Sequence, residues 1–143
     1  MINREIIQSK SEEIVTYIVE LEPHLELLTH EIIHDLKILR SVERLFQLVT
    51  DTAIGINSHL ITELNLPVPN DFSNTFITLG ENHILSMEFA QKIAKSVGLR
   101  NLIVHKYGKV DLKRMVDDIK ADISDYTEYL KNIKTYIDSL EIK

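Results

Sequence analysis

Apolar residues recur at steps of three and four along most of this chain, which is the spacing of one face of an α-helix. A first helix is predicted from about residue 3 to residue 21, and its apolar face is Ile7, Ile14, Ile18 and Leu21. Pro23 is expected to break or kink this helix, because proline has no backbone N–H to donate. A second helix is predicted from about residues 25–29 to residue 64. Its apolar stripe is typical of a long bundle helix and consists of Leu39, Val42, Phe46, Val49, Ala53, Ile56 and Leu60.

The second half of the chain begins with a loop and continues with further helices. Pro67 and Pro69 indicate a loop over residues 65–74, after which Ser73 is expected to cap a short helix that ends at Gly80. A long helix is predicted from about residue 86 to residue 106, closed by Gly108. Its apolar stripe contains one charged residue and reads Ala90, Ile93, Val97, Arg100 and Val104.

Asp111 is a good N-cap for a last helix, which is predicted to reach about residue 140. The stripe of this helix is Met115, Ile119, Ile123, Tyr126, Leu130, Ile133, Ile137 and Leu140. No segment alternates apolar and polar residues for long, so no sheet is expected. The predicted fold is therefore all-α, a bundle of four main helices plus a short helix. Residues 1–143 are expected to form a single domain, because this length is usual for one domain.

Composition narrows the class of protein. The sequence has no cysteine, which excludes disulfides, thiolate zinc sites and a cysteine nucleophile. The N-terminal stretch MINREIIQSK carries charges where a signal peptide would be apolar, and no apolar run approaches the length of a membrane span. We therefore expect a soluble, cytoplasmic protein with no membrane partner.

Charge is distributed unevenly along the chain. Between Lys92 and Arg114 there are seven Lys or Arg residues and one acid, Asp111, so this segment has a formal charge of +6 in a chain of −6. A basic segment is where an anionic partner is expected to bind. Its centre is the stretch GLRNLIVHKY at residues 98–107, in which polar residues interrupt an otherwise apolar helical run.

A second stretch with candidate chemistry is HEIIH at residues 30–34, which has the HExxH pattern of zinc proteases. In those enzymes two histidines on one helix face bind zinc, and the glutamate is the general base. The extended form of the motif fails here, because Lys37 and Arg40 stand where a glycine and a third histidine are needed. A solvated helix face is the simpler interpretation, so no metal and no cofactor is predicted. Zinc hydrolysis stays an alternative that metal analysis would decide.

Arg100 and His105 are the pair that suggests a reaction. Asn101 and His105 are four residues apart and share a helix face, whereas Arg100 lies about 140° around the axis from His105. An arginine on an apolar stripe needs a partner for its charge. Two explanations stay open from the residues alone. Arg100 pairs with an acid of a neighbouring helix or with a partner subunit, or the stripe opens there into a pocket that binds an anion.

If the anion is RNA, the substrate brings its own nucleophile, the 2′-hydroxyl. His105 would then move a proton, and Arg100 would stabilise the pentacoordinate phosphorane without a metal. One histidine cannot take the proton from the 2′-hydroxyl and give one to the leaving 5′-oxygen at once. A symmetric dimer would supply the second copy if the two helices meet near the two-fold axis.

The same residues resemble a known family. Residues 100–107 have the R-x4-H-x-Y motif of HepT-like toxins, a branch of the HEPN ribonuclease superfamily. The similarity covers nearly the whole chain. The second long helix ends in INSHLITEL, the proline-containing loop LPVPNDF follows, and a short helix precedes GLRNLIVHKY and a last helix that begins at an aspartate.

This resemblance implies an all-α HEPN fold that works as a homodimer, with the two motifs forming one RNA-cleaving cleft. Arg100 and His105 would be the catalytic pair, Asn101 would orient His105 or the phosphate, and Lys106 would bind the phosphate. Tyr107 would be the regulatory residue, to which a nucleotidyltransferase antitoxin of the MntA type transfers AMP. The charge and bulk of the added AMP would repel and block RNA.

Two functions therefore stand as hypotheses. The first is the toxin of a type VII-like toxin–antitoxin pair, an endoribonuclease that needs no metal. The alternative is a non-catalytic HEPN module that binds nucleotides or proteins as the partner of a nucleotidyltransferase. Growth arrest and RNA shortening on expression without the neighbouring gene would distinguish the two.

Overall fold

The computed structural model describes residues 1–106 and 109–141, and over these residues the chain forms helices and no strands. Four helices are long: α1 (Arg4–Leu25), α3 (Leu36–Glu63), α5 (Met87–His105) and α6 (Leu112–Glu141). Two are short: α2 (Thr29–Ile33) and α4 (Ser73–Glu81). The all-α prediction is thus confirmed, but a second short helix, α2, was not separated by the sequence pattern.

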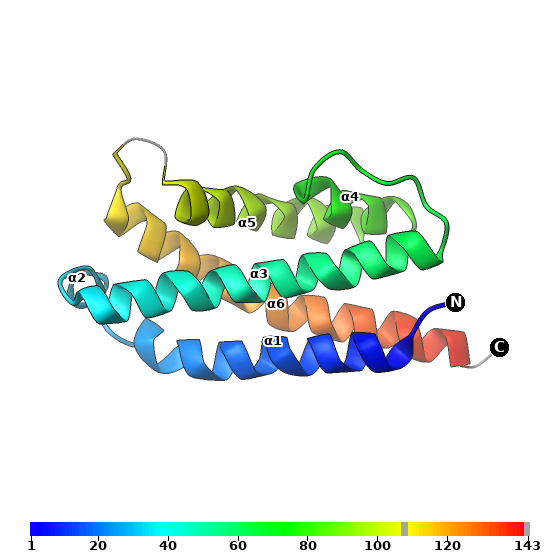
Figure 1. Ribbon diagram of the computed structural model, residues 1–143, viewed down its shortest axis with the longest axis horizontal. Helices are drawn as coiled ribbons and strands as arrows, with labels where there is room; N and C mark the ends of the chain where they lie inside the picture. The colour runs from blue at the N-terminus through cyan, green and yellow to red at the C-terminus, as the bar shows by residue number, and fades with distance from the viewer. Residues whose placement is uncertain (107–108, 142–143) are drawn as a thin grey trace.

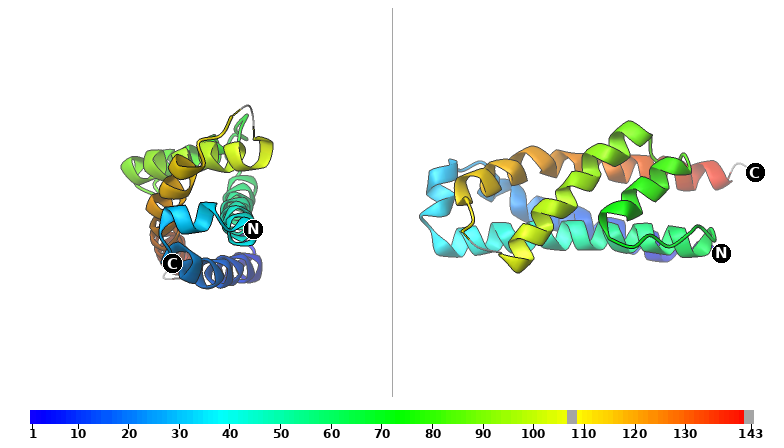
Figure 2. Two further views of the ribbon diagram at one scale, coloured as in Figure 1. Left: turned by 90° about the vertical axis from the view of Figure 1, so that its left-hand side faces the viewer. Right: turned by 90° about the horizontal axis from the view of Figure 1, so that it is seen from above.

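The long helices form a bundle (Figure 1). The helices α1, α3 and α6 extend side by side along the long axis, and α1 is antiparallel to the other two. Above them lie α4 and α5, which pack against each other, and α5 crosses the lower helices obliquely when seen from above (Figure 2). As a result, the C-terminal end of α5 comes to lie over the N-terminal half of α3.

The apolar stripes of the long helices meet in the core. All seven stripe residues predicted for the second helix are buried in α3. The aromatic rings of the core contact each other edge to face, with 6.3 Å between the ring centres of Phe46 and Tyr126 and 5.7 Å between those of Phe76 and Tyr129. This geometry is favourable for aromatic pairs beyond the apolar area that they bury.

The boundaries of the first helices differ from the prediction. Helix α1 continues past Pro23 and ends at Leu25. The long helix expected from residues 25–29 onward is two helices, because the backbone is extended at Asp35 (φ −118°, ψ 103°). The Asp35 carboxylate accepts hydrogen bonds from the backbone N–H groups of Lys37 and Ile38. Aspartate is a strong N-cap, so it begins α3 as a separate helix.

The start of α4 also differs from the prediction. Phe72, and not Ser73, is the residue that precedes the helix. The capping carboxylate is that of Asp71, which accepts hydrogen bonds from the Asn74 backbone N–H at 2.9 Å and the Ser73 hydroxyl at 2.8 Å. Ser73 therefore contributes to the cap as a donor rather than as the acceptor that was expected.

Gly80 does not end α4, which continues to Glu81. Gly80 is buried where α4 packs on α5, and a Cβ atom at this position would lie 2.7 Å from the Cβ atom of Ala90. Real Cβ atoms do not approach so closely, so glycine permits the contact between the two helices.

The starts of the last two helices agree with the prediction, and Asp111 is the N-cap that was expected. Ser86 accepts a hydrogen bond from the Phe89 backbone N–H at 3.2 Å, and Asp111 accepts one from Arg114 at 3.1 Å. Helix α5 ends at His105, and the backbone of Lys106, which follows as its C-cap, is left-handed (φ 47°, ψ 50°). Gly108, which was expected to close this helix, lies outside the described residues.

The apolar line of α5 shifts near its C-terminal end. Val104, which was predicted to face the core, is 39% exposed, whereas Leu99 and Ile103 are buried. The shift turns the face that carries residues 101, 104 and 105 outward. No helix within the described ranges is both long and apolar enough to cross a membrane.

Candidate active site

Helix α5 and the residue that follows it carry four of the five predicted site residues, which are Arg100, Asn101, His105 and Lys106. The fifth, Tyr107, lies outside the described residues. Arg100, Asn101 and His105 belong to the last two turns of α5, and Lys106 follows them, on the side of the molecule where α5 passes over α3. The site is therefore built on a rigid helix end and not on a loop.

Arg100 is held by contacts from three elements. Its Nε atom donates a hydrogen bond to Oδ1 of Asp51 on α3 at 2.7 Å, and its Nη1 atom donates to Oδ1 of the neighbouring Asn101 at 3.1 Å. The guanidinium carbon lies 5.7 Å from the centre of the Phe72 ring. The Arg100 side chain is only 15% exposed. Two explanations for Arg100 were left open above. The structure shows the first of them, a pair with an acid of a neighbouring helix.

The pair with Asp51 leaves part of the hydrogen-bonding capacity of the Arg100 guanidinium available. An arginine has five N–H donors in a planar fork, and the hydrogen bonds to Asp51 and Asn101 take two of them. Within the part of the chain that the structure describes, the others are available to the oxygens of a phosphate. Asp51 also fixes the plane of the fork, because a carboxylate on Nε restricts rotation about the end of the side chain.

His105 is the last residue of α5, and it is exposed. Asn101 lies one turn earlier and is exposed too, so the two side chains share the outward face that their spacing predicts. The predicted role of Asn101 was to orient His105 or the phosphate. In this chain its amide oxygen accepts a hydrogen bond from Arg100, which ties it to the arginine, and its predicted role stays a prediction.

Lys106 contacts a buried carboxylate. Its ammonium nitrogen lies 3.0 Å from one oxygen of Glu43 and 3.2 Å from the other. The Glu43 side chain is 5% exposed and also accepts a hydrogen bond from Arg40 at 2.6 Å. Two cations thus compensate one buried carboxylate, as burial of a charge requires. The prediction that Lys106 binds phosphate is not tested by these contacts, but they show that the lysine holds the end of α5 to α3.

The basic segment around the site is largely neutralised in the fold. Five of its seven cations pair with carboxylates of α3 and α6, in the pairs Lys92–Asp125, Arg100–Asp51, Lys106–Glu43, Lys113–Asp117 and Arg114–Asp118. The local charge of +6 counted along the sequence is therefore not a broad electropositive surface. An anion would be bound by a few directed donors rather than by a general field.

The HEIIH stretch has a structural explanation. Glu31 accepts a hydrogen bond from the Leu28 backbone N–H at 2.9 Å, which caps the short helix α2. His34 follows the end of α2, and its Nδ1 atom lies 2.6 Å from the carbonyl oxygen of His30. Among the described residues, no group of three or more His, Cys, Asp or Glu side chains is arranged to hold a metal ion.

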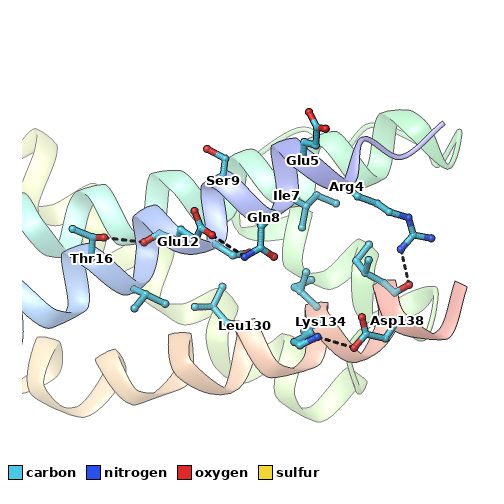
Figure 3. A pocket seen from close by; sticks show the side chains of 14 residues that line it. Arg4, Glu5, Ile7, Gln8, Ser9, Glu12, Thr16, Leu130, Lys134 and Asp138 are labelled. Carbon is cyan, nitrogen blue, oxygen red and sulfur yellow. Dashed lines mark hydrogen bonds and ion pairs between the residues drawn. The ribbon is translucent and has the colours of Figure 1, made fainter. Parts of the chain in front are cut away.

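Two hollows of the surface are candidates for a ligand-binding site. One, of about 850 Å³, lies between α1 and α6 (Figure 3), and several of its charged groups are bonded to one another or to the backbone. Arg4 donates to the carbonyl oxygen of Ile137, and Lys134 pairs with Asp138 at 2.9 Å. The other hollow, of about 440 Å³, is lined by residues 70–73 before and at the start of α4 and by Val97 and Asn101 of α5. Of the two, only the second is lined by residues that contact Arg100, which are Phe72 and Asn101.

Sequence reasoning missed three residues of this site: Glu43, Asp51 and Phe72. Glu43 and Asp51 lie on the flanks of the α3 stripe and are 63 and 49 positions away from the residues that they contact, Lys106 and Arg100. No local spacing connects residues so far apart. Phe72 stands in LPVPNDF, which was predicted only as a proline-containing loop.

A helical bundle that presents an arginine and a histidine five residues apart at one helix end has the architecture of a HEPN ribonuclease. Comparison with protein families places the chain more closely: the family described as ribonuclease HepT-like matches residues 14–133. The chain belongs to this family and is by that membership a ribonuclease. The resemblance drawn from GLRNLIVHKY is thereby confirmed.

Known relatives agree with this assignment. The chain is 38% identical to the tRNA nuclease HepT of Aphanizomenon flos-aquae over 99 residues, which are 69% of this chain and 67% of that protein. It is 26% identical to the mRNA nuclease HepT of Shewanella oneidensis over 84 residues, 59% of this chain and 63% of that protein. Among solved structures, the tri-AMPylated Shewanella oneidensis HEPN toxin in complex with MNT antitoxin has the same fold. The TM-score is 0.83 at 24% identity, over 91% of this chain and 97% of that one.

Proposed function

We propose that this protein is the toxin of a toxin–antitoxin pair, an endoribonuclease that cleaves RNA through its 2′-hydroxyl without a metal. The observation that carries the proposal is the pair on α5, an exposed His105 at the helix end and Arg100 held by Asp51 with donors left for phosphate. Membership of the ribonuclease HepT-like family supports the reaction class.

In the proposed reaction two copies of His105 share the proton transfers. One neutral imidazole takes the proton of the 2′-hydroxyl, whose oxygen attacks the adjacent phosphorus atom. The imidazolium of the other copy gives a proton to the departing 5′-oxygen, so the products are a 2′,3′-cyclic phosphate and a 5′-hydroxyl. Arg100 donates to the phosphate oxygens on which negative charge develops, and a permanently charged fork is well suited to that task.

The two copies of His105 require a homodimer in which the α5 helices meet. The outward face of α5 supports this arrangement, because Gly98, Asn101 and His105 are all exposed and lie one turn apart along it. A Cβ atom at Gly98 would have no neighbour within 4 Å, so a second helix could approach closely at this point. Val104, an apolar residue left 39% exposed beside this face, would be covered by the partner.

The cleanest test of a shared site is a heterodimer with one inactive protomer. Wild-type chain and His105→Ala chain are produced together with different tags, and the doubly tagged species is purified. If each cleft needs both histidines, its rate of RNA cleavage should fall at least a hundredfold, the loss expected on removing a general acid or base. Two independent sites would leave half of the wild-type activity, which would contradict the shared site.

Controls separate this proposal from the binding-module alternative. His105 is exposed, so His105→Ala should keep the helical circular dichroism signal and the melting temperature of the wild type. Cleavage should be unchanged by a chelator if no metal takes part. If the wild-type chain binds nucleotides but neither cleaves RNA nor arrests growth, the non-catalytic function is the correct one.

The proposed regulation is transfer of AMP to Tyr107 by a nucleotidyltransferase antitoxin. The solved structure with the same fold is a tri-AMPylated toxin in complex with MNT antitoxin, which motivates this part of the proposal. Co-expression with the neighbouring nucleotidyltransferase should add the mass of one or more AMP groups and abolish RNA cleavage. A Tyr107→Phe chain should remain unmodified and active under the same conditions; modification of that variant would place the acceptor elsewhere.

A further inference from the structure

Phe72 is an aromatic side chain left open beside the candidate site. It is 51% exposed, and its ring lies 5.7 Å from the Arg100 guanidinium. It forms part of the wall of the hollow of about 440 Å³ that Asn101 borders from α5. A half-exposed phenylalanine gains little from the core of its own chain. Its place between the proposed catalytic arginine and an open hollow indicates a role in binding a ligand.

The backbone of Phe72 is anchored in the core. Its carbonyl oxygen accepts a hydrogen bond from the Thr75 hydroxyl at 2.7 Å, and the buried Asn57 of α3 donates to that hydroxyl at 3.1 Å. Asn57 in turn accepts from the hydroxyl of Tyr129, which is fully buried on α6. This chain of hydrogen bonds ties the loop to two long helices, so the ring projects from a fixed point. A preorganised platform of this kind binds a ligand at a smaller entropic cost.

The polar groups of the hollow suit a neutral ring better than an anion. Hydrogen bonds from the Asn74 backbone and the Ser73 hydroxyl lower the pKa of Asp71, so this wall carries a negative charge near neutral pH. A phosphate would be repelled there. The side-chain amides of Asn70 and Asn101 offer both donors and acceptors, which match the edge of a nucleobase. The face of Phe72 is a surface on which such a base can stack.

We propose that this hollow is a nucleobase subsite, in which one base of the RNA substrate stacks on Phe72 while the adjacent phosphate is bound by Arg100. The inference rests on the proposed ribonuclease function and names a residue that positions the substrate. The Arg100 guanidinium lies 5.7 Å from the centre of the Phe72 ring, and the donors that Asp51 and Asn101 do not use remain for the phosphate. Base and phosphate of one nucleotide are joined by a single sugar, so neighbouring subsites of this kind can hold both.

The test is a double-mutant cycle that combines the Phe72→Leu substitution in the protein with removal of one base from the RNA. A short RNA with one cleavage site is prepared, and each nucleotide that flanks the site is made abasic in turn. On intact RNA, Phe72→Leu should lower kcat/KM by about tenfold, mostly through KM, because base–aromatic stacking of ordinary strength is lost. At one abasic position the wild-type chain should show the same loss, and Phe72→Leu should cause no further loss there.

A control variant and the set of abasic substrates separate stacking from the contact with Arg100. Phe72→Trp keeps an aromatic face and should retain most of the wild-type kcat/KM. If Phe72 only positioned Arg100, Phe72→Leu would lower kcat on the intact and every abasic substrate alike, and the subsite would be wrong. A wild-type chain that cleaves no RNA would overturn the proposed function itself, whereas additive effects of Phe72→Leu and every abasic site would overturn only the subsite.

A binding measurement gives a readout that does not depend on cleavage. The His105→Ala chain is mixed with the same RNA carrying 2-aminopurine at the position identified above. Stacking on Phe72 should quench its fluorescence, and the double variant with Phe72→Leu should lose most of that quenching. Equal quenching with and without Phe72 would contradict the inference.

Discussion

At the scale of one residue, Arg100 is a largely buried charge that is compensated by a carboxylate and still has N–H donors that the hydrogen bonds to Asp51 and Asn101 do not use. Its side chain is 15% exposed, so its charge must be compensated, and Asp51 does this through Nε at 2.7 Å. In the proposed reaction, the N–H groups that Asp51 does not use bind the RNA phosphate. Asp51 is 35% exposed, so the pair is partly screened by water and its contribution to the free energy of unfolding is moderate.

We predict that the hydrogen bond from Arg100 to Asp51 matters more than the charge of Asp51. In Asp51→Asn an amide oxygen can still accept from Nε, so kcat should stay within about threefold of the wild type. In Asp51→Ala the guanidinium loses its acceptor, so the free energy of unfolding should fall by about 1–2 kcal/mol and kcat by about tenfold. Urea unfolding and single-turnover cleavage measure the two effects. Wild-type kcat in Asp51→Ala would show that Asp51 does not position Arg100.

At the scale of helices, the position of the site depends on how closely α4 approaches α5. Gly80 is the contact point, and the loop before α4 carries Phe72 to the side of Arg100. Separating the two helices would therefore move the wall of the hollow as well as weaken the core.

We predict that Gly80→Ala is destabilising by about 1–2 kcal/mol. The new Cβ atom would lie 2.7 Å from the Cβ atom of Ala90, and the cost of overpacking exceeds the helix propensity that alanine adds. In an Ala90→Gly background the clash is absent, so there Gly80→Ala should be neutral or stabilising. Thermal unfolding of the four chains in this cycle measures the coupling. Equal effects of Gly80→Ala in both backgrounds would contradict the clash.

Helix α6 contains a carboxylate that opposes folding at neutral pH. The pKa of Asp122 is raised to about 6, first by burial and then by the charges of Asp125 and Asp118. Between the ordinary pKa of an aspartate and this value, the folded chain holds a proton that the unfolded chain has lost. The free energy of unfolding therefore falls as pH rises through this range, and the penalty is complete above it.

Asp122→Asn should consequently stabilise the protein at pH 7.5 and have little effect near pH 4. The full shift would be worth about 3 kcal/mol, but Asp122 is only half-buried, so we expect a gain of about 1 kcal/mol. Urea unfolding at the two pH values measures it. Asp138→Asn is the control, because this exposed carboxylate pairs with Lys134 and its loss should not stabilise. A pH-independent effect of Asp122→Asn would show that the charge is not the cause.

At the scale of the whole molecule, the proposed active site is half of a site in each chain. Each chain has one His105, and the exposed face of α5 with Gly98 at its middle is the surface on which a second copy would complete it. Five of the seven cations of the basic segment are already paired with carboxylates, so one chain offers few N–H donors to an RNA phosphate. In the proposed dimer, two copies of Arg100 would bring their donors to one cleft.

We predict that Gly98→Trp abolishes dimer formation and RNA cleavage together. The single chain has room for the side chain, since no atom lies within 4 Å of a Cβ at Gly98, so the protomer should still fold. Light scattering after gel filtration gives the mass, and circular dichroism checks the fold. Ala121→Trp on the exposed side of α6 is the matched control and should remain dimeric and active. A dimer that persists in Gly98→Trp would exclude this face as the interface.

The sequence by itself determined the helical class, the apolar stripes of the long helices and the stretch that carries the site. These features are local, because helical periodicity, capping residues and the R-x4-H spacing involve residues within a few turns of each other. Where two local signals competed, the pattern was ambiguous. Asp35 begins a new helix inside the segment that was predicted as one helix, and Val104 rather than Ile103 was assigned to the core.

The tertiary structure decided what surrounds that stretch. The partners of Arg100 and Lys106 come from α3, 49 and 63 positions earlier, and Phe72 is brought to Arg100 by the packing of α4 on α5. Such pairs form because burial of charge requires compensation wherever the chain happens to pack, which no spacing along the sequence encodes. For the same reason a segment of charge +6 in the sequence became, in the fold, a set of paired side chains around a few donors.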